Sequence, residues 1–73
     1  MLAWLRPPFL HRLCIVNLQS DKDTAVRGVL WQTRGAWLVV RQAALLSGSA
    51  APTPVDGEVV IHRSNVAFIQ VVP

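Results

Sequence analysis

Cysteine is almost missing from this sequence of 73 residues. Cys14 is the single example, which excludes an internal disulfide and a cysteine-rich metal site. It lies within the apolar run LCIVNL, and this context predicts a small buried side chain rather than a reactive thiol. We expect neither a metal nor a cofactor.

Charge is scarce as well. Charged residues make up 15% of the chain, whereas hydrophobic residues make up 52%. A domain of this length has too much surface to hide so much apolar material in its own core. We therefore expect part of it to face a partner, which predicts an assembly subunit.

The basic residues form no run. Six arginines and one lysine outweigh four acids, giving a net charge of +3, and they are scattered from Arg6 to Arg63. Such a distribution permits a nucleic-acid partner but does not favour one.

Groups that could act in catalysis are few. His11 and His62 are the only imidazoles, and the sequence has no phosphate-binding glycine loop and no metal-ligand motif. We expect the protein not to be an enzyme. The opening MLAWLRPPFL is too short to span a membrane and has no signal-peptide cleavage pattern, so we expect no membrane partner and a cytoplasmic origin.

Residues 1–9 are predicted to form an extended apolar arm, because the paired prolines exclude a helix at that point. So apolar a segment is expected to dock into a groove on another protein. The residues predicted to dock are Trp4, Leu5, Pro7, Pro8 and Phe9.

Residues 10–73 are predicted to form one all-β domain. Alternating apolar residues indicate five strands, and Gly28, in the middle of the second, predicts a sharp bend or a close backbone approach. Short strands with strong bends are typical of a small, highly curved sheet or barrel, such as the SH3 type. The expected strands are 10–18, 25–32, 36–46, 58–62 and 65–72, and the longest loop between them is 47–57.

The order of these features resembles the Sm-like (LSm) family. CIVNL, VRGVL and LVVRQA stand where that family has the strands of its first motif. VVIHRSNVAFIQVVP resembles the second motif, which is a strand, a short corner and a strand that often ends in proline. The resemblance covers about residues 12–73 and implies a small β-barrel.

The resemblance also implies a mode of assembly. In Sm-like proteins the last strand of one subunit pairs with the strand before the corner in its neighbour, and the subunits form closed rings. This would account for the apolar excess and for a last strand without any charge. We expect copies of the chain to form a ring or lattice, with a subunit edge made of Val66, Phe68, Ile69 and Val71.

The residues that read RNA in this family are largely missing. QTRGAWLVV has no counterpart of the family's Asp–x–x–x–Asn-like segment, and QSDKD replaces an Asp-Gly turn. His62 and Arg63 at the corner could contact a phosphate or a base, and Trp31 and Trp37 could stack on one. The other interpretation is that His62 caps the corner, Arg63 pairs with an acid of a neighbour, and both tryptophans pack at a barrel mouth or an interface.

The combination RPPF, VRGVLW and VDGEVVI resembles small Sm-like proteins encoded among the virion-structure genes of tailed bacteriophages. This resemblance implies a structural protein of the capsid, the portal or the head-to-tail junction, which is located in the virion and binds larger virion proteins. The alternative is a cytoplasmic Sm-like ring that binds single-stranded RNA.

Overall fold

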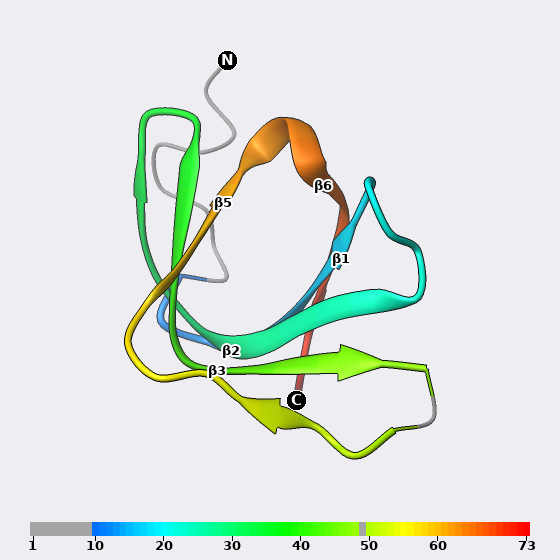
Figure 1. The fold of residues 1–73 in the computed structure, drawn as a ribbon. Coiled ribbons are helices and arrows are strands. Elements are labelled where there is room, and N and C mark those ends of the chain that lie inside the picture. Colours follow the sequence, from blue (N-terminus) through cyan, green and yellow to red (C-terminus); the bar gives the residue numbers. More distant parts are fainter. Residues whose placement is uncertain (1–9, 49) are drawn as a thin grey trace.

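A computed structural model describes residues 10–48 and 50–73. They form an antiparallel sheet of six strands, which confirms the prediction of an all-β fold. The strands are β1 (Leu13–Leu18), β2 (Thr24–Arg34), β3 (Trp37–Ser47), β4 (Thr53–Pro54), β5 (Val59–His62) and β6 (Val66–Val71), and a 3-10 turn, η1 (Arg63–Asn65), joins the last two. The strands curl around a common centre (Figure 1).

The strand bounds differ from the predicted ones at three places. β1 begins at Leu13 because His11 takes a left-handed backbone conformation (φ 65°) in a turn before it. The hairpin turn lies at residues 35–36, and β2 continues through Arg34. The predicted count of five strands is wrong, because the segment 47–57 contains β4, which pairs with β3 and is followed by a backbone bond from Val55 N–H to Ala43 O (2.9 Å).

The sheet runs in the order β5-β3-β2-β1-β6, and β4 pairs with the far end of β3. Two irregularities bend the long β2–β3 ribbon. Trp31 is an extra residue of β2, and β3 has an extra residue near Gln42, whose φ is 52°. Each such bulge increases the local twist and turns the strand, so the sheet can wrap around its own core.

Gly28 lies opposite the second bulge and has the close approach that the sequence predicts. A Cβ atom built there would lie 2.6 Å from Val40 Cγ1 and 2.7 Å from the Arg41 carbonyl oxygen. Glycine is therefore required here by space. Its missing side chain allows the bulged part of β3 to lie close against its partner β2.

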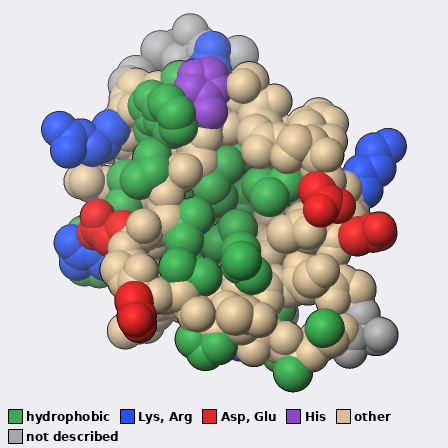
Figure 2. Space-filling view, in the orientation of Figure 1, with side chains coloured by type: hydrophobic (Ala, Val, Ile, Leu, Met, Phe, Trp, Pro, Cys, Tyr) green, Lys and Arg blue, Asp and Glu red, His purple; other side chains and the backbone are tan. Residues whose placement is uncertain are grey.

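The core lies inside this curl and is built from the inward-facing residues of each strand. Figure 2 shows hydrophobic side chains gathered in the middle of one face, looking into the curl, with charged ones towards the rim. The most deeply buried residues are Cys14, Val16, Val26, Leu30, Leu38 and Val40. Cys14 is 1% exposed, as predicted. The pKa of its thiol is raised, because the effect of burial is larger than the opposing effect of the nearby positive charge of Arg12.

Candidate functional site

The corner between β5 and β6 is built by local hydrogen bonds. His62 Nδ1 accepts a bond from the Ser64 backbone N–H (3.2 Å) and lies 2.8 Å from Ser64 Oγ, so His62 caps η1. The Arg63 N–H donates to Ala36 O (2.7 Å), which ties the corner to the β2–β3 turn. Asn65 Oδ1 accepts from the Ser20 N–H (2.8 Å) at the other side. The 3-10 turn needs no left-handed residue, so Arg63 fits at this corner without backbone strain.

Two of the four residues predicted for nucleic-acid contact meet at this corner. The rings of Trp37 and His62 lie edge to face with their centroids 4.8 Å apart, and Arg63 follows His62 in the chain. Trp37 is 47% exposed, so its ring is still available to a partner. Trp31 is not part of this cluster: it lines a different hollow, together with Val29, Arg41 and Gln42.

Trp31 belongs to a row of contacting side chains on the outer face of the sheet. The Arg41 guanidinium lies 4.1 Å from the centre of its ring, and the centroids of the His11 and Trp31 rings are 5.0 Å apart. Arg41 Nε also donates to Glu58 Oε2 (2.7 Å). The interpretation from the sequence was that Arg63 pairs with an acid of a neighbouring copy. Glu58 instead forms an ion pair with an arginine of its own chain. Both partners are nearly half exposed, so the ion pair adds little stability.

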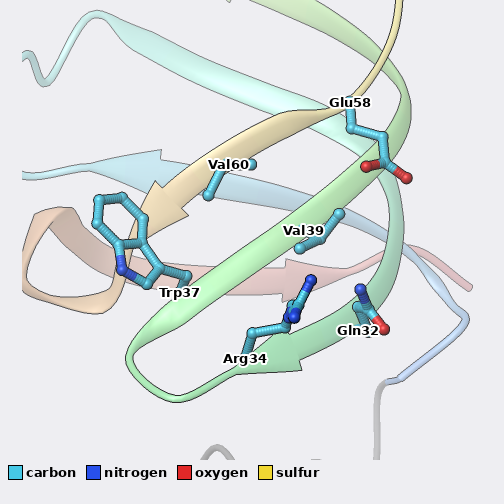
Figure 3. Close-up of a pocket in the computed structure, with 6 residues that line it drawn as sticks. All are labelled: Gln32, Arg34, Trp37, Val39, Glu58 and Val60. Atoms are coloured by element: carbon cyan, nitrogen blue, oxygen red, sulfur yellow. The ribbon is translucent and has the colours of Figure 1, made fainter.

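An open groove of about 550 Å³ lies next to the corner. In Figure 3 its side chains project from one face of β2 and β3, from β5, and from the residue that precedes β5. Trp37, Val39 and Val60 make it mainly apolar, and the polar side chains lie around them. Val60 is 53% exposed, while Val39, its cross-strand neighbour on β3, is only 4% exposed. The complete lining is Gln32, Arg34, Trp37, Val39, Glu58 and Val60.

Both ends of the sheet are open within the described part of the chain. There, β5 pairs with β3 alone and β6 with β1 alone, so each presents one edge of unpaired backbone groups. Among the predicted edge residues, Phe68 (58%) and Val71 (39%) are exposed, whereas Val66 and Ile69 pack partly against the core. Val71 faces inward opposite the buried Cys14 and is still exposed, because no strand covers it at the open end.

The predicted docking residues Trp4, Leu5, Pro7, Pro8 and Phe9 lie outside the described residues. Leu10, which follows them, packs against the core cluster. Over residues 10–48 and 50–73, no group of three or more His, Cys, Asp or Glu side chains is placed to hold a metal ion. No helix in that part of the chain is long and apolar enough to cross a membrane.

The sequence reasoning did not find the groove. Its members come from three separate segments, and the bulge at Trp31 shifts the alternation of β2 so that Gln32 and Arg34 join Val39 on one face. One signal was present for Val60, because strict alternation around the buried Ile61 turns it outward. An exposed valine beside an exposed tryptophan marks a surface that is suited to contact.

Comparison with solved structures finds chains with a similar fold. A chain in the crystal structure of the NatC complex bound to CoA superimposes with a TM-score of 0.73, at 23% sequence identity, over 88% of this chain and 79% of that one. At this identity the likeness concerns the fold alone. No family model matches the sequence, and no curated protein matches it.

Proposed function

We propose that this protein is a structural assembly subunit of a tailed-phage virion, built as a small Sm-like β-barrel. The observation that carries the proposal is the pair of open strand edges on β5 and β6, each beside exposed apolar side chains. Because β6 has no charge to protect its edge, strand pairing with another chain is favourable.

The Sm-like part of the proposal is supported by topology and by residues. The order β5-β3-β2-β1-β6, with a 3-10 corner between the two outermost strands, fits the motifs that the sequence resembles. One solved structure with a similar fold is a chain of the NatC complex. Such a small domain is suited to work as a part of a larger assembly, because its own core is small and its edges are open.

The virion part of the proposal comes from the resemblance of RPPF, VRGVLW and VDGEVVI to small phage structural proteins. In this proposal the chain packs against copies of itself through its strand edges and docks onto a larger virion protein through the arm 1–9. Its place is a minor capsid, decoration, portal-associated or head-to-tail component.

Virion composition tests this function. We expect mass spectrometry of purified virions from cells that carry the gene to find the chain in stoichiometric amounts relative to a capsid or portal protein. A chain without residues 1–9 should keep the β spectrum of the folded domain but fail to enter the particle, because its docking segment is gone. Virions that lack the intact chain would contradict the proposal, and incorporation of the truncated chain would contradict the role of the arm.

A second function, single-stranded RNA binding by an Sm-like ring, is favoured by one observation. Trp37 and His62 come from different strands and touch beside Arg63, which brings a stacking surface and a cation together. This function requires that the protein bind a uridine-rich oligonucleotide at sub-micromolar concentration and that Arg63→Ala weaken the complex. That result would replace the virion proposal, which assigns no RNA to the corner.

A further inference from the structure

A second exposed surface lies on the outer face of the sheet, away from the two open strand edges. Alternation beside the buried Cys14 turns Leu13 outward, where it is 41% exposed, and the strand register places Val29 of β2 directly opposite it. Other outward-facing side chains of β1, β2 and β3 continue this surface. These residues form the outer patch: Leu13, Ile15, Val29, Trp31, Arg27 and Arg41. A cluster of outward apolar side chains, unlike a single one, marks an interaction site.

Arg41 is positioned by two neighbours. Its guanidinium lies 4.1 Å from the centre of the Trp31 ring, and its Nε donates to Glu58 Oε2 (2.7 Å). In the described part of the chain this is its one ion pair, so the N–H groups of its terminal nitrogens remain to bind an incoming group. A guanidinium fixed in this way loses little conformational freedom on binding, and its fork matches the two oxygens of a carboxylate.

A hollow beside Arg41 determines the size of the group that can bind. Its volume is about 280 Å³, just below the range of pockets that enclose a whole small molecule. Val29 and Trp31 give it apolar walls, and Gln42 adds an amide that can form hydrogen bonds. The hollow therefore fits one side chain of a partner better than a free small-molecule ligand, and an acidic side chain matches the guanidinium.

We propose that the outer patch docks a segment of another protein in which an acidic side chain has apolar neighbours. The carboxylate enters the hollow and binds the Arg41 guanidinium through its fork, while the apolar neighbours cover Leu13 and Val29. The inference rests on the proposed assembly role, in which the chain binds a larger protein, and it names the surface and the chemistry of that contact. Because the patch lies on β1, β2 and β3, the edges of β5 and β6 stay free for other copies.

Charge disfavours the other occupants of the outer patch. Two copies that met through it would bring Arg27 and Arg41 of one against the same cations of the other. Residues 1–9 have no acid, so this segment of the chain cannot supply the carboxylate. A nucleic acid would bring its phosphates close to the carboxylate of Glu58, which repels them. A protein segment that is both acidic and apolar fits best.

Selection from a library of short random peptides tests this chemistry. The probe is the library itself, selected on the immobilised full chain and counter-selected on a Leu13→Gln variant, which removes apolar surface from the patch without changing its charge. We expect the retained peptides to share an Asp or Glu flanked by apolar residues. Retained peptides without an acid, or rich in Lys or Arg, would overturn the inference, and so would a selection that retains no peptide.

The affinity of one retained peptide for protein variants tests the role of Arg41. Arg41→Gln should weaken the complex about tenfold, because a charge-assisted pair is lost. Arg41→Lys keeps the charge without the planar fork and should recover only part of this affinity. Replacing the acid of the peptide with its amide should cost as much as Arg41→Gln and should add little in that variant. Independent losses from the two changes would overturn the inference.

Arg34→Gln is the matched control, because Arg34 lines the groove and lies outside the outer patch. It should bind the peptide like the unaltered protein, and circular dichroism checks that every variant is folded. Equal weakening by Arg34→Gln and Arg41→Gln would show a general attraction between charges and would overturn the inference.

Two further measurements distinguish the other occupants. If an oligothymidine displaces the peptide from the unaltered protein and binds Arg41→Gln more weakly, the patch binds nucleic acid. If Leu13→Gln lowers the oligomer mass in light scattering, the patch joins copies of this chain. Either result overturns the inference. Because the selection uses the purified protein alone, its failure leaves the virion proposal to be decided by virion composition, and absence from virions leaves a positive selection standing.

Discussion

Replacing Val60 with lysine should reduce the protein in solution to single chains of 8.0 kDa while leaving the domain folded. Val60 is 53% exposed on the outer face, so the isolated domain loses little when it is changed. In the proposed pair, however, the ammonium would be buried without a partner. A penalty of about 3 kcal/mol per interface weakens association by about two orders of magnitude.

Light scattering at several protein concentrations, together with circular dichroism, measures this effect. Val60→Thr is the matched control, because threonine keeps the β-branched shape and carries no charge. We expect the Thr variant to assemble like the unaltered chain. If the Lys variant forms an oligomer of the same mass as the unaltered protein, the edge of β5 is not the contact surface.

Replacing Gly28 with alanine should have the largest effect on stability. The added Cβ would lie within 3.0 Å of both Val40 Cγ1 and the Arg41 carbonyl oxygen, and a backbone oxygen cannot move aside as a flexible side chain can. Overpacking of this kind costs about 1–3 kcal/mol, and we expect the upper end of that range. Chemical denaturation in the Val60→Lys background, where unfolding is not coupled to assembly, measures the free energy of unfolding.

Gly35→Asn provides the control for this substitution. Gly35 has φ 58° in the hairpin turn, and no atom lies within 4 Å of a Cβ built there. Asparagine tolerates this left-handed conformation, so a loss well below that of Gly28→Ala is expected. Equal losses at the two positions would show that the contact between β2 and β3 at Gly28 is not as tight as described.

Much of the fold could be predicted from the sequence because the apolar alternation is strong. The pattern around Cys14, Val26 and Leu30 assigns inward faces correctly, and Gly28 marks a place where β3 approaches β2 closely. The two-residue β4 could not be predicted, because a Thr-Pro pair in a Ser- and Ala-rich loop has no strand signal. β4 is a strand only because it pairs with the end of β3, and the loop sequence does not show that the end of β3 lies beside it.

The candidate site was less predictable than the fold. The sequence places His62 and Arg63 at a corner, but the contact of His62 with Trp37 depends on pairing between β3 and β5, which are far apart in the chain. Trp31 was grouped with Trp37 because they flank one turn, yet a bulge at Trp31 sends it to a different hollow, beside Arg41. Bulges change the side to which a side chain points, and alternation alone does not reveal them.

Amide hydrogen exchange at the two open edges tests most directly the claim that β6 of one copy pairs with β5 of another. The Val72 N–H donates to Leu13 O and the Arg63 N–H donates to Ala36 O, so by alternation the N–H groups of Ile69 and Val71 on β6 and of Val60 and His62 on β5 point out from the open edges. We predict slow exchange for these four groups in the unaltered protein. In the Val60→Lys variant the Ile69 and Val71 groups should exchange quickly, while Phe68 and Gln70, whose N–H groups point towards β1, stay slow in both. Equally fast exchange of Ile69 and Val71 in the two proteins would contradict the claim.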